Sequence, residues 1–248
     1  MWGGGAGGSR APGNGRTREG GREPGGGGSA AHIRSHKRRT GRLGPTRYDA
    51  IARLWPTVGV DLDGRVLDLA SLFGRVAPVV LEIGFGMGEA TAAMAQAEPE
   101  VNLLAVDVHT PGVGALCHLL EVMGLPNVRV AHCDAVLLLR ERVAESSLAG
   151  VRLFFPDPWP KHKHHKRRLL QAPFVEHVAS RLVPGGVLHV ATDYLPYAEQ
   201  VAQDWDAEPL LQRVGFDAPS RMRPERPSTK REGRAQRGAS SITHRAEG

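Results

Sequence analysis

The feature that most constrains the fold is a repeated alternation of short apolar runs and longer amphipathic stretches from Ala77 onward. The runs suit strands that are buried on both faces, and they lie at Val79–Ile83, Asn102–Val106, Val128–Ala131, Val151–Phe155 and Val187–Ala191. Helical patterns separate them at Glu89–Ala97, Val113–Met123, Ala135–Ala144 and Leu169–Leu182. This alternation predicts an α/β fold with a mostly parallel sheet and helices on both faces. Right-handed crossovers would place the carboxyl ends of the strands at one edge, where such sheets bind ligands.

The composition changes twice before this region. Residues 1–30 contain thirteen of the 31 glycines and almost no apolar side chains, so they bury too little surface to offset their ordering entropy. We expect a disordered glycine-rich head at 1–30, a basic arm at 31–47 and a folded domain at 48–248. The domain is expected to start with a short helix at Tyr48–Leu54, where apolar residues recur at helical spacing.

Charge is distributed unevenly along the chain, whose net charge is +6. Residues 1–47 carry ten Lys or Arg and two acids, and residues 219–248 carry eight Lys or Arg and three acids. Residues 48–218 are acidic, with fourteen Lys or Arg and 21 acids, although they include a run of cations at 161–168. Two basic ends and one basic loop on an acidic domain indicate binding to the phosphates of a nucleic acid.

Cysteine content and hydropathy point to one compartment. Cys117 and Cys133 are the two cysteines, they form no CxxC pair, and they cannot provide a disulfide framework. No apolar run approaches the roughly 18 residues that a membrane-spanning helix needs. The first residues lack the apolar core of a signal peptide. We therefore expect a cytoplasmic protein that does not associate with membranes.

A glycine-rich turn follows the first predicted strand, in Glu82-Ile83-Gly84-Phe85-Gly86-Met87-Gly88-Glu89. Its G-x-G-x-G spacing allows a tight turn and close approach of a ligand, but it differs from the G-x-G-x-x-G of dinucleotide sites. Glu89 puts a negative charge where a helix begins, which would repel a pyrophosphate. Together with Glu82 it favours a cationic ligand. S-adenosyl-L-methionine, which carries a sulfonium and an ammonium, fits better than NAD.

Two more acids follow predicted strands at the same edge. Asp107 ends the second strand, where a carboxylate can accept hydrogen bonds from ribose hydroxyls. Asp134 follows the third strand and is placed to meet an adenine amino group. Acids and a glycine turn at three strand ends together predict a nucleoside cofactor.

The fourth predicted strand leads into a loop with an acid, an aromatic side chain and a cluster of cations. Pro156 ends the strand, Asp157 and Trp159 follow between prolines, and residues 161–168 are all Lys, Arg or His. The cations suit phosphate contacts. Trp159 could stack on a base or wedge the loop into the core. His162, His164 and His165 lie among five Lys or Arg with no cysteine nearby, which disfavours a metal site, so we expect no metal.

On these residues the chain resembles the bacterial tRNA (guanine-N7)-methyltransferase family from about Ile33 to the last strand. Residues 156–161 with 166–168 are very similar to the family signature, and Leu81–Gly88 resembles its cofactor loop. Thr192-Asp193-Tyr194 and Thr229-Lys230-Arg231-Glu232 resemble its two further substrate segments. The resemblance implies a Rossmann-like class I methyltransferase fold and methyl transfer from S-adenosyl-L-methionine to N7 of guanine 46 in the variable loop of tRNA.

The resemblance also implies a role for individual residues. The cofactor would be bound by the acids Glu82, Asp107, Asp134 and Asp157 over the turn of Gly84, Gly86 and Gly88. Asp157 would lie closest to the chemistry. The tRNA would be held by Lys161, Asp193, Thr229, Lys230, Arg231 and Glu232. The partner would be tRNA, and the enzyme a monomer or homodimer.

The chain departs from the family pattern at two places. Asp107 stands where the family usually has Glu, and Arg231 stands where it has Phe. The residues after 232 are few and polar, and Ser240-Ser241-Ile242-Thr243 makes a poor final strand by composition. Asp193 could also simply cap the helix expected at Tyr194–Trp205. Two alternatives therefore stay open: a methyltransferase acting on another acceptor, and a non-catalytic RNA-binding protein on a methyltransferase scaffold.

Overall fold

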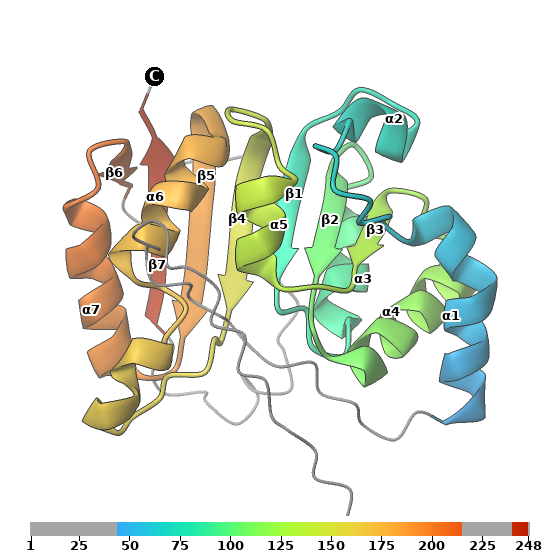
Figure 1. Cartoon of the computed structure of the whole chain (residues 1–248), viewed down its shortest axis with the longest axis horizontal. Coiled ribbons are helices and arrows are strands. Elements are labelled where there is room, and N and C mark those ends of the chain that lie inside the picture. Colours follow the sequence, from blue (N-terminus) through green and yellow to red (C-terminus); the bar gives the residue numbers. More distant parts are fainter. Residues whose placement is uncertain (1–43, 215–239, 248) are drawn as a thin grey trace, which may run out of the picture. The chain divides into compact units, whose positions relative to one another are not determined.

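A seven-stranded sheet organises the chain, in the order β3-β2-β1-β4-β5-β7-β6 (Figure 1). The structure is a computed structural model that describes residues 44–214 and 240–247. These all belong to the second of the chain's two units, Ile33–Gly248. The strands are β1 Val79–Ile83, β2 Asn102–Val106, β3 Val128–Ala131, β4 Leu148–Phe154, β5 Leu182–Thr192, β6 Leu211–Arg213 and β7 Ser240–Ala246. β1 to β5 pair in parallel, and β7 runs antiparallel to both of its neighbours.

Helices cover both faces of the sheet, which confirms the predicted α/β architecture (Figure 1). On one face α5, α6 and α7 pack on β1, β4 and β5, with Trp205 and Tyr197 fully buried. On the other face α1, α3 and α4 pack on β1 to β3 around Leu103 and Leu116. The helices are α1 Pro45–Val58, α2 Leu69–Phe73, α3 Glu89–Ala97, α4 Thr110–Met123, α5 Ala135–Glu141, α6 Ala172–Arg181 and α7 Leu195–Asp206, with a 3-10 helix η1 at His162–Arg167.

The bounds of several elements agree with the sequence, and others differ: β4 and β5 begin at Leu148 and Leu182, earlier than the predicted Val151 and Val187. The first three strands and α3 match the predicted ranges. α1 begins at Pro45, earlier than the expected Tyr48, because proline suits the first turn of a helix. The prediction that residues 240–243 make a poor final strand is wrong. β7 pairs with β5 from Thr192↔Ser240 to Val187↔Arg245, and His244 is buried with its ring 5.0 Å from that of Trp205.

In the described ranges, no helix is long and apolar enough to span a bilayer.

Candidate active site

A cavity of about 290 Å³ opens at the carboxyl ends of the parallel strands. Its wall comes from Ile83 and Gly84 after β1, residues 106–108 after β2, Cys133 and Ala135 around the start of α5, residues 153–159 after β4, and Gly86, Arg167 and Leu169. This is the edge of the sheet at which the sequence analysis predicts the cofactor site. The volume is near the lower end of the range for small-molecule pockets.

The glycine turn forms one side of the cavity. Gly84, Gly86 and Gly88 have positive φ angles of 76°, 61° and 82°, which side chains with a Cβ rarely adopt. α4 packs closely against this turn, because a Cβ on Gly112 would lie 1.9 Å from the carbonyl oxygen of Gly86. The turn is therefore fixed by its own backbone and by the first turn of α4.

Asp107 joins the glycine turn to the end of β2. Its Oδ2 accepts a hydrogen bond from the backbone N–H of Gly86 at 3.0 Å, and its Oδ1 accepts one from His109 at 2.9 Å. The carboxylate also lines the cavity, so its remaining lone pairs can face a ligand. Asp134 is placed differently. Its side chain caps α5 by accepting from Val136 N–H at 2.8 Å, and the residues on either side of it line the cavity.

Glu82 lies in the middle of the sheet, beside the cavity wall and not part of it. The residue is 3% exposed, and its Oε2 atom has no hydrogen-bond partner. Burial raises the pKa of its carboxyl group to about 7, although the Arg152 guanidinium opposes this shift. A buried carboxylate with an unpartnered oxygen is costly, so this position suits a ligand that brings a positive charge.

The loop after β4 holds Asp157 in a strained backbone. Phe155 and Trp159 have positive φ angles of 52° and 42°, which are unfavourable for bulky side chains. Phe155 N–H donates to Ala191 O at 2.7 Å, which ties the start of the loop to β5. Asp157, between the two strained residues, lines the cavity. The surrounding structure must therefore hold the loop in this shape.

Arg168 is one of the residues that hold the loop in this shape. Its Nε donates to Pro158 O at 2.8 Å, its Nη1 donates to Gln200, and its guanidinium lies 4.8 Å from the centre of the Tyr197 ring. The side chain is 2% exposed. The interpretation that the whole basic run contacts phosphates is therefore wrong for Arg168. Its planar guanidinium carries several N–H donors, and two of them are used inside the protein, on Pro158 O and on the Gln200 side chain.

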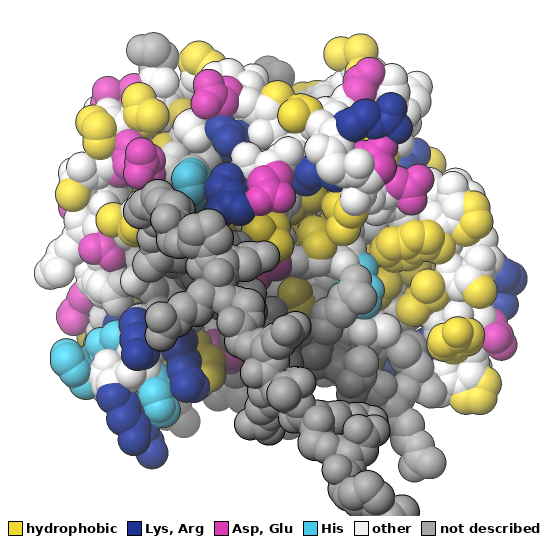
Figure 2. Space-filling model, viewed as in Figure 1, with side chains coloured by type: hydrophobic (Ala, Val, Ile, Leu, Met, Phe, Trp, Pro, Cys, Tyr) yellow, Lys and Arg dark blue, Asp and Glu magenta, His cyan; other side chains and the backbone are white. Residues whose placement is uncertain are grey.

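The remaining cations form an exposed basic loop, defined here as residues 161–167. Lys161, Lys163, Lys166 and Arg167 are exposed, and Figure 2 shows this group of Lys, Arg and His side chains together on one part of the surface over η1. Arg167 also reaches the cavity and lies 5.1 Å from the centre of the Trp159 ring. Trp159 thus contacts the basic loop and the cavity, and its stacking on a base stays a prediction. No group of three or more described His, Cys, Asp or Glu is arranged to hold a metal ion.

The substrate residues lie partly outside the described part. Asp193 is exposed between β5 and α7. The idea that Asp193 caps this helix is wrong, because the N-cap is Tyr194 and no side-chain capping bond forms. Thr229, Lys230, Arg231 and Glu232 lie outside the described residues. Sequence reasoning missed Gly112 and Arg152. A glycine after Pro111 in a helix start is a weak signal, and an arginine inside an apolar run is a stronger one.

The residues that line the cavity, together with Glu82 beside its wall, fit S-adenosyl-L-methionine. Glu82 has an unpartnered buried oxygen that an ammonium would satisfy, Asp107 offers acceptors for ribose hydroxyls, and the backbone at Gly86 leaves no Cβ in the way. A parallel sheet with this turn and these acids defines a class I S-adenosyl-L-methionine-dependent methyltransferase.

Comparison with known proteins identifies the family. Residues 76–244 match the model of the family described as "Putative methyltransferase". The chain is 54% identical to a tRNA (guanine-N(7)-)-methyltransferase of Streptomyces coelicolor over 85% of its length and 79% of the relative's. It is 51% identical to one of Nitrosospira multiformis, covering 83% of this chain and 89% of that one. The chain belongs to the tRNA (guanine-N7)-methyltransferase family.

A solved structure supports the fold. The chain is similar to the 16S rRNA (adenine(1408)-N(1))-methyltransferase from Catenulisporales acidiphilia, solved with its cosubstrate, with a TM-score of 0.50. The identity is 14%, and the match covers 76% of this chain and 93% of that one. This likeness bears on the fold alone, and it agrees with the class I architecture.

Proposed function

We propose that the protein transfers the methyl group of S-adenosyl-L-methionine to N7 of guanine 46 in the variable loop of tRNA. Relatives named as tRNA (guanine-N(7)-)-methyltransferases support the substrate and the reaction. The observation that carries the proposal is the position of Asp157. It lines the cofactor cavity in a strained loop that continues directly into the exposed basic loop. One short segment thus connects a methyl-donor site with a surface for phosphates.

The reaction requires alignment more than proton transfer. When bound, the cofactor supplies a methyl group on a positively charged sulfur. Guanine N7 carries a free lone pair, so no base has to remove a proton before it attacks. The methylated guanine gains positive charge, and a carboxylate at Asp157 would stabilise that charge and orient the base. Glu82, Asp107 and Asp134 would hold the cofactor over the glycine turn.

The basic loop would bind the tRNA backbone. Lys161, Lys163 and Lys166 are exposed, and each cation that meets a phosphate adds affinity that falls with salt. Asp193 would accept from the donor edge of guanine, since a carboxylate reads N–H groups. The segment from Thr229 to Glu232 would complete the substrate site. Exposed, unpaired bases are the usual targets of sequence-specific RNA recognition, which suits a variable loop.

The direct test is methylation of unmodified tRNA with labelled S-adenosyl-L-methionine, followed by mass spectrometry of nucleosides and of RNase fragments. We expect 7-methylguanosine at position 46 and none in a tRNA that carries adenine there. Asp157→Asn should lower kcat about 100-fold, since one electrostatic contact at a reacting group has this size, with little change in tRNA affinity. A protein that binds cofactor and tRNA but transfers no methyl group would overturn the proposal in favour of a non-catalytic RNA-binding protein.

Three further points belong to the same proposal. Residues 48–248 would form the methyltransferase domain, with residues 31–47 as a basic arm and 1–30 as a glycine-rich head. The enzyme would act in the cytoplasm, as a monomer or homodimer. Light scattering of the purified protein with and without tRNA would separate these two states.

A further inference from the structure

A buried ion pair lies behind Glu82, on the side of the sheet that α3 covers. Arg152 lies on β4 directly opposite Glu82 on β1 in the parallel register. Residues paired in this way point to the same face of a sheet, so the guanidinium and the carboxyl group are neighbours. Arg152 is 2% exposed and Glu98 is 8% exposed. Neither residue is part of the cavity wall.

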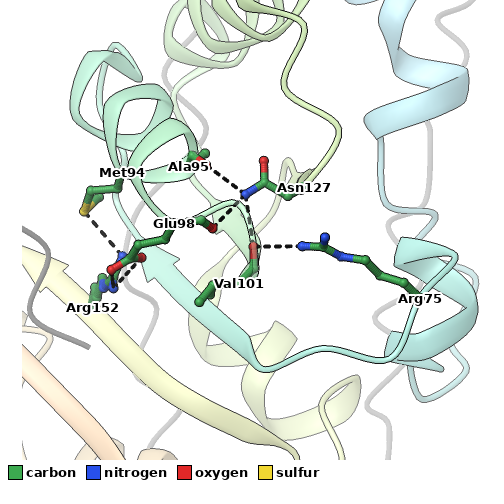
Figure 3. Close-up of polar contacts among 7 residues, drawn as sticks. All are labelled: Arg75, Met94, Ala95, Glu98, Val101, Asn127 and Arg152. Carbon is green, nitrogen blue, oxygen red and sulfur yellow. Dashed lines mark hydrogen bonds and ion pairs between the residues drawn. The ribbon is translucent and has the colours of Figure 1, made fainter. Parts of the chain in front are cut away.

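Arg152 also forms an ion pair with a second acid, Glu98. Its Nη2 lies 3.0 Å and 2.9 Å from the two carboxylate oxygens of Glu98, and its Nη1 lies 3.5 Å from the sulfur of Met94 (Figure 3). The buried group therefore contains one cation and two acids. If both acids were ionised without a ligand, one negative charge would be left without a partner, which is strongly unfavourable in a protein interior.

The end of α3 keeps Glu98 in place. Glu98 is the C-cap of α3, and the side-chain amide of Asn127 donates to the carbonyl oxygens of Ala95, Glu98 and Val101 at 2.9, 3.2 and 3.0 Å (Figure 3). Arg75 approaches Val101 O from the other side at 3.3 Å. α3 begins at the glycine turn, and the ion pair joins its C-terminal end to β4, the strand that leads into the loop with Asp157.

We propose that the Arg152–Glu98 pair controls the charge of Glu82, and thereby sets the pH range in which the enzyme binds the ammonium group of its cofactor. Arg152 and Glu98 are positioning residues in this scheme, because they act through Glu82. The charged groups that act on Glu82 in the described ranges are Arg152 from β4 and Asp107 from the end of β2, with Glu98 from α3 acting through Arg152. The inference rests on the assigned cofactor and not on the position of the methylated guanine.

Substitutions of Arg152 and of Glu98 should shift the pH range of cofactor binding in opposite directions. Arg152→Met removes the cation that lies beside Glu82 among the described residues, so the carboxyl group ionises at higher pH. Cofactor binding should therefore be restricted to higher pH. Glu98→Gln releases Arg152 to act on Glu82 alone, so binding extends to lower pH. A merely structural pair would give the same loss in both variants, since either substitution breaks the same ion pair.

The experiment measures the dissociation constant of S-adenosylhomocysteine by calorimetry between pH 5.5 and 9. This ligand keeps the amino group of the cofactor, and the titration of that group is the same for all variants. The variants are therefore compared in the acid limb of the curve, which is the pH range in which the dissociation constant rises as the pH falls. Arg152→Met leaves Glu98 buried without a partner and can fail to fold. The double variant Arg152→Met with Glu98→Gln removes both charges and serves as its folded equivalent. Thermal melts identify the folded variants.

We expect the acid limb of the double variant to move up by about one pH unit, which is about a tenfold weaker dissociation constant near pH 6. The limb of Glu98→Gln should move down. Limbs that coincide with wild type, or that move in the same direction, would refute the inference, as would a wild type that binds no ligand at any pH. Opposite shifts in a protein that methylates no tRNA would support this inference and reject the proposed function.

Discussion

Replacing Glu82 by glutamine should raise the unfolding free energy of the cofactor-free protein above that of the wild type, and it should do so more at pH 8 than at pH 5. Burial raises the pKa of Glu82 from its ordinary 4.5 to about 7. Between these values the folded state keeps a proton that the unfolded state has released. The stability that this proton provides is complete below pH 4.5 and is lost as the pH rises through 7. Glutamine has the shape of the protonated acid and does not titrate, so the variant avoids this loss.

The size of the effect follows from the two pKa values. Linkage gives a loss of about 2.5 kcal/mol in the unfolding free energy of the wild type between pH 5 and pH 8, which the variant lacks. Urea unfolding at both pH values measures the difference between the two proteins. Glu121→Gln is the matched control, because Glu121 is a surface acid whose pKa is lowered by its hydrogen bond to Arg53, so its removal should act in the opposite direction. If the difference in unfolding free energy between Glu82→Gln and the wild type were equal at both pH values, the Glu82 carboxyl group would ionise at the same pH in the folded and the unfolded protein, and the reasoning would be refuted.

The other predictions concern the turn and the loop. Gly112→Ala should weaken S-adenosyl-L-methionine binding at least about tenfold in calorimetry, because the new Cβ would lie 1.9 Å from Gly86 O and one backbone must move; an unchanged affinity would contradict this packing. Arg168→Lys keeps the positive charge but loses the planar guanidinium and its hydrogen bonds, so the unfolding free energy should fall by about 2 kcal/mol. The salt dependence of tRNA binding should stay the same. Lys163→Gln should do the reverse, lowering the salt slope by about one with no change in melting temperature; a slope that changes for Arg168→Lys and not for Lys163→Gln would reject the division of the basic residues.

The parts of the fold that the sequence predicted are those specified by local pattern. The first three strands are apolar at every position, or nearly so, and their bounds agree with the structure because both faces are buried. β7 was misjudged because it is polar by composition. Its pairing with β5 and the packing of His244 against Trp205 supply what its own residues do not show. Such a strand is defined by its neighbours, which lie far away in the sequence.

The site shows the same division at the level of single residues. Asp107 and Asp157 could be predicted to lie at the cavity because each comes within three residues of the end of a strand, and the ends of parallel strands meet at one edge. Arg168 was assigned to phosphates because it ends a run of cations, yet its contacts with Pro158 and Gln200 depend on how the loop folds back on α7.

The charge of Glu82 is even harder to predict from the sequence. It depends on Arg152, 70 positions later, and the two become neighbours only through the register of β1 with β4. Arg152 in turn is held by Glu98 at the end of a helix on the same face. The sequence motif therefore predicts which acid meets the cofactor, while in our proposal the protonation of that acid is set by residues outside the motif. Members of the family that share the glycine turn but lack this buried pair should accordingly bind the cofactor over a different pH range, which the same calorimetric titration can compare.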